Sequence, residues 1–261
     1  MRVNHVIDGP EDGEVVVLSG SLGSDLGMWN PQVGPLVSAG YRVVRYDHRG
    51  HGGTPVPDAP CSLDDLGGDV VELLDGLGVD RAHVVGLSLG GMTGLWLAAH
   101  RPDRVRRLVV CCTSAKLGTP EMWEQRAHTA VTRGMTEIAD GSIERWFTPA
   151  WRAANPELTR EYHRMTASVP ARGYAACCAA IGAMDLRGVL STITAPTLVI
   201  AGADDPATPP DEHGRPLAEG IPGARFEVVA EAAHLGNVEQ PERFTELIIE
   251  HLKADGGESH G

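Results

Sequence analysis

Short apolar runs alternate along the chain with segments of helical spacing. Runs of strand length lie at 14–18, 41–46, 82–87, 107–112, 196–201 and 224–230. Segments with apolar residues three or four positions apart, the spacing of one helix face, lie at 62–77, 89–100 and 241–252. This alternation is typical of βα units, in which helices pack on a mostly parallel sheet. The pattern therefore predicts the α/β class.

The pattern changes between residues 114 and 190. Strand-like runs are missing there, helical spacing dominates, and the tryptophans Trp123, Trp146 and Trp151 lie close together in the sequence. We therefore predict an all-helical cap at 114–190, inserted into a core domain formed by 1–113 and 191–261. The small and polar tail from residue 254 onward is expected to be disordered.

The junction between the third predicted strand and the helix after it reads Gly86-Leu87-Ser88-Leu89-Gly90. A G-x-S-x-G segment in this setting is the pattern of a nucleophile elbow, a tight turn that holds a serine hydroxyl at the top of a sheet. The residues two before and two after the serine must be small, because the turn is strained and leaves no room for bulky side chains. Ser88 is therefore predicted to be a catalytic nucleophile.

An acid and a histidine follow in the order that such a serine requires. Asp204 and Asp205 come directly after the fifth predicted strand, and His234 follows the sixth. Because the carboxyl ends of parallel strands meet at one edge of a sheet, we expect these side chains at the same edge as Ser88. His234 would take the serine proton and the acid would orient the imidazole. Asp205, which directly precedes Pro206, is favoured over Asp204.

A reacting carbonyl also needs backbone amides that stabilise its developing oxyanion. The Leu89 amide is a candidate because it directly follows the nucleophile at a helix N-terminus. The second amide is expected from the glycine-containing loop after the first strand, where Leu22 and Ser21 are both candidates. The loop at 47–52 contains two histidines, and we expect it to support the rim of the site rather than to take part in catalysis.

Composition narrows the class of partner. The chain has 35 acidic and 22 basic residues and a formal charge of −13, which argues against nucleic acid and against an anionic membrane as partners. No apolar stretch approaches the roughly 18 residues of a membrane span. The first residues lack the apolar region of a secretory signal.

The cysteines are odd in number and lack a Cys-x-x-Cys spacing, so they predict neither a disulfide framework nor a zinc site. They are Cys61, Cys111, Cys112, Cys177 and Cys178. We expect them to be buried thiols in a protein of the reducing cytoplasm. The histidines show no ligand spacing, so neither a metal nor another cofactor is expected.

The chain resembles the α/β-hydrolases over nearly its whole length, and within them it is most similar to 3-oxoadipate enol-lactonases. The motif at the elbow is common to the superfamily, whereas the loop at 21–29 and the cap segments are more specific. The similar segments are SLGSDLGMW at 21–29, RYDHRGHG at 45–52, GLSLGGM at 86–92, TSAKLG at 113–118, EMW at 121–123, RWF at 145–147 and GYAACCAAI at 173–181.

The resemblance implies an α/β-hydrolase fold and a serine hydrolase that opens 3-oxoadipate enol-lactone to 3-oxoadipate in the catabolism of aromatic compounds. It implies Ser88, Asp205 and His234 as the triad, with the Leu22 and Leu89 amides as the oxyanion hole. A substrate with a free carboxylate calls for a basic or polar contact in the cap. The candidates for that contact are Trp123, Arg126, Arg133, Arg145 and Trp146.

Two features keep other activities open. After Ile181 the chain has Gly182, where the family often has an arginine. In addition, a fold does not fix a substrate, so a carboxylesterase, another lactonase or a carbon–carbon bond hydrolase has the same triad. A non-catalytic binding protein of the same fold would need no intact triad. Dehalogenase and epoxide hydrolase chemistry uses an aspartate nucleophile and is excluded by Ser88.

Overall fold

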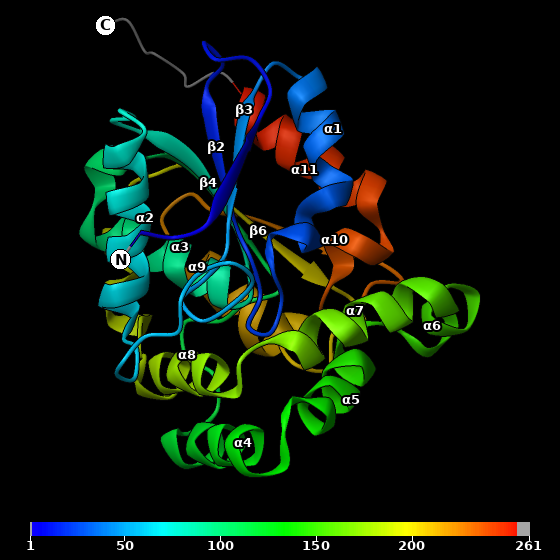
Figure 1. Ribbon diagram of the computed structural model, residues 1–261. Coiled ribbons are helices and arrows are strands. Elements are labelled where there is room, and N and C mark those ends of the chain that lie inside the picture. The colour runs from blue at the N-terminus through cyan, green and yellow to red at the C-terminus, as the bar shows by residue number, and fades with distance from the viewer. Residues whose placement is uncertain (1, 255–261) are drawn as a thin grey trace, which may run out of the picture.

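A seven-stranded sheet forms the centre of the computed structural model, which describes residues 2–254 (Figure 1). The strand order is β1-β3-β2-β4-β5-β6-β7, and every pair is parallel except β1 with β3. The strands are β1 (His5–Asp8), β2 (Val15–Ser19), β3 (Arg42–Tyr46), β4 (Ala82–Leu87), β5 (Val105–Cys111), β6 (Thr197–Gly202) and β7 (Arg225–Val229). The predicted fold class is therefore confirmed.

Helices cover both faces of this sheet. One face carries α2 (Leu63–Gly76) and α3 (Leu89–His100), and the other carries α1 (Asn30–Ser38) and α11 (Pro241–Lys253) (Figure 1). Neighbouring residues of one strand serve opposite faces: Val17 belongs to the first of two apolar clusters, whereas Val16 belongs to the second. Burial on both faces explains why these strands read as continuous apolar runs in the sequence.

Five helices follow one another between β5 and β6 and lie together beyond one edge of the sheet (Figure 1). They are α4 (Pro120–Arg133), α5 (Met135–Trp146), α6 (Pro149–Ala154), α7 (Pro156–Ser168) and α8 (Ala171–Ala183). Short helical segments complete the described chain: η1 (Leu26–Trp29), η2 (Pro102–Arg104), η3 (Arg187–Thr192), η4 (Pro210–Gly214), α9 (Arg215–Gly220) and α10 (Gly236–Glu239).

Local pattern located most elements but missed two of them. β4 and α3 begin and end where the sequence predicts, and Ser62 caps α2 through the amide of Asp65. The sequence pattern did not predict β1, which is a partly exposed edge strand of four residues. It also did not predict α1, whose sequence contains Pro31 and Pro35. The prediction of a disordered tail falls almost wholly on 255–261, outside the described residues.

Two neighbouring glycines of α2 offer a matched test of the packing between α2 and α3. A Cβ on Gly67 would lie 1.9 Å from Cε3 of Trp96, whose ring stacks on His100, while a Cβ on Gly68 would meet nothing within 4 Å. We expect Gly67→Ala to destabilise the fold by about 1–3 kcal/mol through overpacking. Gly68→Ala should stabilise it by about 0.5–1 kcal/mol through helix propensity. Urea denaturation of the two variants checks the opposite signs, and equal effects would contradict this packing.

Candidate active site

Ser88 occupies a strained turn between β4 and α3. Its φ of 56° and ψ of −115° lie outside the usual regions of a residue with a side chain, and it is 6% exposed. A Cβ on Gly86 would lie 2.1 Å from the Gly90 carbonyl oxygen, and a Cβ on Gly90 would lie 2.1 Å from that of Ser19. These close backbone approaches give the steric reason for glycine on both sides of the serine.

Asp205 and His234 form a buried pair on the loops that follow β6 and β7. His234 Nδ1 lies 2.8 Å from Asp205 Oδ2, which also accepts a hydrogen bond from the Thr208 hydroxyl at 2.6 Å. Asp205 Oδ1 accepts the amides of Ala207 and Thr208 at 2.8 and 3.1 Å. Asp204, the alternative acid, is exposed. The geometry therefore selects Asp205 as the partner of His234.

The surroundings of Asp205 favour its ionised form. Burial raises the pKa of this carboxyl, but His234 and the hydroxyl and amide of Thr208 outweigh the burial, so the pKa lies below the ordinary value. An ionised Asp205 has no proton to share with His234, so Nδ1 of the imidazole carries the proton between them. In the neutral imidazole with this tautomer, Nε2 is the nitrogen with the lone pair that a general base requires.

The two turns that carry the candidate oxyanion-hole amides are joined by a backbone hydrogen bond. The Gly90 amide donates to the Gly20 carbonyl at 2.9 Å, which links the start of α3 to the loop after β2. The Ser88 amide is also engaged, since it donates to the Cys111 carbonyl at 2.9 Å. The Leu89 amide, between these two, makes no hydrogen bond to any of the described residues.

The loop after β2 likewise has one free backbone amide between two amides that are engaged. The Ser21 amide lies 3.1 Å from the thioether sulfur of Met28, and the Gly23 amide donates to His51 Nε2 at 3.0 Å. Within residues 2–254 the Leu22 amide, between them, has no hydrogen-bond partner. Of the two amides that the sequence left as alternatives, Ser21 is engaged and Leu22 is free.

The loop after β3 holds the loop after β2 in place through hydrogen bonds. Buried Asp47 accepts the amides of Leu26 and Gly53 at 2.7 and 2.8 Å, and it accepts the side chain of Asn4 at 2.7 Å. His48 Nε2 lies 3.0 Å from the Gly20 carbonyl oxygen, so this nitrogen donates. The loop at 47–52 therefore fixes the position of the loop after β2.

Glu239 is a site residue that sequence reasoning missed. Its buried carboxylate accepts the Ala233 amide and, at 2.8 Å each, the amide and hydroxyl of Thr148. It therefore joins the loop that carries His234 to the start of α6. No local pattern could have identified this role of Glu239, because its partner Thr148 comes from a distant part of the chain. Thr208 was missed as well, although an Asp followed three residues later by Thr is typical of a capped turn.

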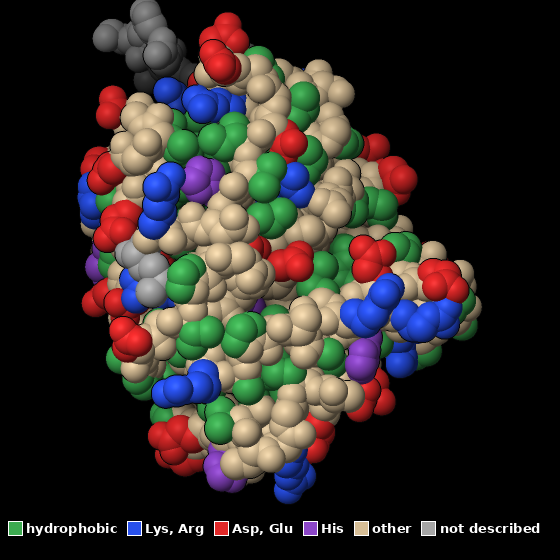
Figure 2. Space-filling view, viewed as in Figure 1, with side chains coloured by type: hydrophobic (Ala, Val, Ile, Leu, Met, Phe, Trp, Pro, Cys, Tyr) green, Lys and Arg blue, Asp and Glu red, His purple; other side chains and the backbone are tan. Residues whose placement is uncertain are grey.

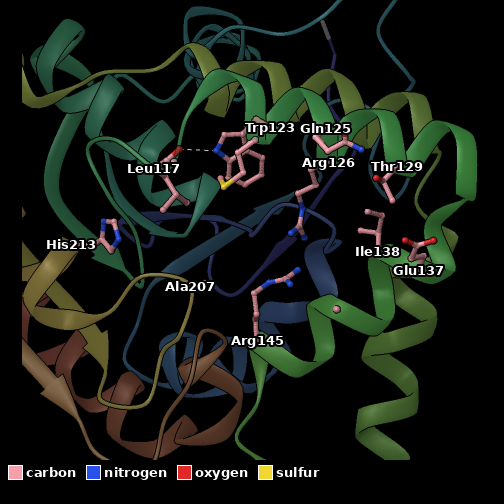
Figure 3. Close-up of a pocket in the computed structure, with 13 residues that line it drawn as sticks. Leu117, Trp123, Gln125, Arg126, Thr129, Glu137, Ile138, Arg145, Ala207 and His213 are labelled. Carbon is pink, nitrogen blue, oxygen red and sulfur yellow. Dashed lines mark hydrogen bonds between the residues drawn. The ribbon is translucent and has the colours of Figure 1, made fainter.

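A cavity of about 590 Å³ lies between the helices α4 and α5 and the loops after β5 and β6. It brings together Trp123, Arg126 and Arg145, three of the five predicted cap residues. The guanidinium groups of Arg126 and Arg145 point toward one another across it, and His213 lies at its other end (Figure 3). Ala207, two residues after Asp205, also lines it and places it beside the Asp205–His234 pair.

The two cavity arginines lack acidic partners. Arg126 Nε donates to the hydroxyl of Tyr174 at 2.6 Å, and its guanidinium lies 5.8 Å from the Trp123 ring centre. Neither Arg126 nor Arg145 forms an ion pair with a carboxylate of the described residues. Burial and the nearby Arg126 lower the pKa of Arg145 to about 10. An anion placed between these two groups would relieve their repulsion.

The other two predicted cap residues lie elsewhere. Arg133 is exposed and does not line this cavity, although Glu137, with which it pairs at 3.2 Å, does. Trp146 is buried, and its ring lies close to Gly23 of the loop after β2. Gly182 faces Pro120 and Trp123, and a Cβ there would lie 3.1 Å from the Cβ of Trp123, so a side chain at this position would require a small shift of Trp123.

Further features of the described residues concern metal ligands, membrane spans, cysteines and surface charge. Among the described residues no group of three or more His, Cys, Asp or Glu side chains is placed to hold a metal ion. None of the described helices is long and apolar enough to cross a membrane. The five cysteines are free and buried. Acidic and basic side chains are interspersed over the face shown in Figure 2.

Comparison with known proteins defines the class. The sequence model of the α/β-hydrolase fold matches residues 14–241, and the chain belongs to this family. The chain is similar to 3-oxoadipate enol-lactonase 2 of Acinetobacter baylyi, with 40% identity over 97% of this chain and 94% of the relative. The crystal structure of the enol-lactonase from Burkholderia xenovorans LB400 has a TM-score of 0.93 and 41% identity, covering 96% of each chain. The predicted family resemblance is thereby confirmed.

A second group of relatives carries a different name. A RutD protein from Variovorax paradoxus, named as a carbamate hydrolase, is 33% identical over 97% of this chain and 96% of its own length. Both groups span the core and the helices between β5 and β6. Both groups carry the names of hydrolases, and the substrate that is named differs between them.

The buried histidines predict how stability depends on pH. Burial, together with nearby His51, lowers the pKa of His48 to about 3, from 6.5. Between pH 6.5 and 3 the unfolded chain therefore binds a proton at this position that the folded protein does not, so the free energy of unfolding falls as pH falls. In His48→Gln, whose amide can still donate to Gly20, we expect the slope to decrease by at most about 1.4 kcal/mol per pH unit.

Denaturant titrations at several pH values between 6.5 and 4 measure this slope. The matched control is His128→Gln, because His128 is exposed on α4 and its imidazole makes no hydrogen bond within the described residues. The two variants should differ in slope even if their stabilities at pH 7 agree. Parallel curves for both variants and the unaltered protein would contradict the buried neutral state of His48.

Proposed function

We propose that this protein is a serine hydrolase that opens the ring of 3-oxoadipate enol-lactone to give 3-oxoadipate. The observation that carries the proposal is the cavity in which Arg126 and Arg145, both without carboxylate partners, face one another beside the buried Asp205–His234 pair. This arrangement suits a small lactone or ester that carries a free carboxylate. The similarity to enol-lactonases over almost the whole chain supports the same substrate.

In the first half of the reaction Ser88 attacks the lactone carbonyl. His234 Nε2 takes the hydroxyl proton, while Asp205 holds Nδ1–H and stabilises the imidazolium. The carbonyl oxygen becomes an oxyanion, and the free amides of Leu22 and Leu89 are its donors. The ring C–O bond then breaks and expels an enolate, which is delocalised and therefore leaves more easily than an alkoxide. His234 gives up the proton that it took from Ser88, and protonation of the enolate at carbon gives the ketone and leaves the imidazole neutral again.

In the second half, water hydrolyses the acyl-enzyme. His234 takes a proton from the water as the water attacks the acyl carbonyl, and the same amides stabilise the second oxyanion. Collapse of this intermediate returns the proton to Ser88 and releases the new carboxylate. The sequence needs no group other than those of the chain and one water molecule.

The helical segment at 114–190 supplies the walls of the cavity, and we propose that it acts as a cap domain on a core of 1–113 and 191–261. The free thiols of the five cysteines fit a protein that works in the reducing cytoplasm. The cap is the part that would decide between an enol-lactone, another ester and a carbamate, because the arginines belong to it.

Loss of the nucleophile should abolish turnover. We expect Ser88→Ala to lower kcat for enol-lactone hydrolysis by about 10⁴-fold or more, because Ser88 and His234 act as one unit. The measurement is the loss of enol-lactone absorbance, with simple aryl esters assayed in parallel. If the unaltered protein hydrolyses the aryl esters but not the enol-lactone, it is a carboxylesterase. If the unaltered protein hydrolyses neither the enol-lactone nor the esters, and a fluorophosphonate does not label Ser88, the protein is a non-catalytic binding protein.

Removal of one cavity arginine should separate charged from neutral substrates. A hydrogen bond to a charged group contributes about 1.5–3 kcal/mol, so Arg145→Gln should lower kcat/KM for the anionic lactone by about 10-fold to 100-fold. For a neutral lactone of similar size the change should stay within about threefold. Arg133→Gln is the control, since Arg133 lies outside the cavity and pairs with Glu137. Equal losses on both substrates would show that Arg145 does not bind the carboxylate.

A further inference from the structure

His51 is held in one neutral tautomer by two backbone groups. The Gly23 amide donates to its Nε2 at 3.0 Å, so this nitrogen carries a lone pair. Its Nδ1 lies 3.0 Å from the Arg49 carbonyl oxygen, which only accepts, so Nδ1 carries the proton. The side chain is fully buried, and burial lowers its pKa. Both nitrogens are therefore committed to the backbone, and neither is available to a substrate.

The bond to Gly23 acts on the residue before it. Gly23 has a φ of 88°, a left-handed conformation, and its amide is turned toward His51 rather than toward the site. The peptide planes on either side of Leu22 are thus fixed. The Gly23 amide holds the plane after Leu22 through His51, and the Ser21 carbonyl holds the plane before it, since it accepts the amide and the hydroxyl of Ser24 at 3.2 and 2.8 Å. The free amide between them belongs to Leu22.

The other side of this loop is equally enclosed. The ring of Tyr174 and the methyl group of Thr166 lie 3.3 Å from where a Cβ of Gly23 would be. The hydroxyl of Tyr174 accepts a hydrogen bond from Arg126. The loop after β2 is therefore sandwiched between His51 of the core and Tyr174 of α8, so loss of the His51 acceptor would leave the Gly23 amide buried without a partner.

We propose that His51 is a positioning residue for the oxyanion hole: its Nε2 holds the Gly23 amide and thereby keeps the Leu22 amide free and aimed at the reacting carbonyl. The inference rests on the proposed function, because it concerns the oxyanion that Ser88 would generate. The sequence predicted only that the loop at 47–52 supports the rim of the site. The inference adds that His51 Nε2 is the supporting atom and that it controls the position of the Leu22 amide.

Two conservative variants separate this role from simple packing. In His51→Gln the side-chain oxygen reaches the place of Nε2 and can accept the Gly23 amide. In His51→Asn the shorter amide reaches the place of Nδ1, so it keeps the Arg49 carbonyl and loses Gly23. Donors of an oxyanion hole act chiefly on kcat, so we expect His51→Asn to lower kcat by about 10-fold to 100-fold with KM within about threefold. His51→Gln should recover kcat to within about fivefold of the unaltered protein.

A tetrahedral inhibitor gives a second readout that stability alone would not change. An alkyl boronic acid bound to Ser88 places an oxygen in the oxyanion hole, whereas the product carboxylate resembles the ground state. His51→Asn should weaken inhibition by the boronic acid about as much as it lowers kcat, and it should change product inhibition within about threefold. Equal kcat in the Asn and Gln variants, or a loss confined to KM, would overturn the proposal.

The unaltered protein provides a test that does not depend on the folding of a variant. Imidazole ¹⁵N shifts, assigned by comparison with His51→Gln or by selective labelling, report which nitrogen carries the proton. Protonation at Nδ1 alone across the pH range of activity supports the proposal, and protonation at Nε2 overturns it. Failure of the proposed function is distinguishable, because the unaltered protein would then show no Ser88-dependent turnover, whatever tautomer His51 has.

Discussion

The turn at Ser88 is the constraint on which the rest of the site depends. A residue with a side chain at φ 56° is strained, and the strain persists only because the surrounding backbone fixes it. The Ser88 amide is bound to Cys111 of β5, and the Gly90 amide is bound to Gly20 of the loop after β2. The same bonds that hold the turn also align two adjacent loops around it, so the strained residue and the free amides form one rigid unit.

The sequence predicted the parts of this unit that local sterics determine and left open those that depend on distant contacts. Ser88, with Gly86 and Gly90, could be identified because a strand, a tight turn and a helix follow one another without a gap. The preference for Asp205 over Asp204 came from the neighbouring Pro206 and from the family resemblance, whereas local sterics alone do not decide between them, because His234 lies on another loop. Glu239 was missed for the same reason: its partners Ala233 and Thr148 come together only in the folded chain.

The cap residues show where sequence reasoning stops. Arg126, Arg133 and Arg145 are equivalent candidates in the sequence, because each lies on a stretch of helical spacing. The crossing of α4 and α5 turns Arg126 and Arg145 into a common cavity and leaves Arg133 at the surface beside Glu137. A net charge of −13 gives no sign of such a pair of arginines, since a sum over the chain does not record which charges gather in one place.

The triad candidates and the walls of the cavity lie on separate parts of the chain. Ser88, Asp205 and His234 are fixed by loops of the sheet, whereas the walls of the cavity come mainly from α4 and α5. The two parts meet through backbone bonds, since the Leu235 amide donates to the Trp146 carbonyl at 3.0 Å. Side chains of α4 and α5 that face the cavity can consequently change with little effect on these loops, whereas Thr148 and Tyr174 contact the core loops through their side chains. This separation accounts physically for relatives of similar length and fold that carry the names of an enol-lactonase and of a carbamate hydrolase.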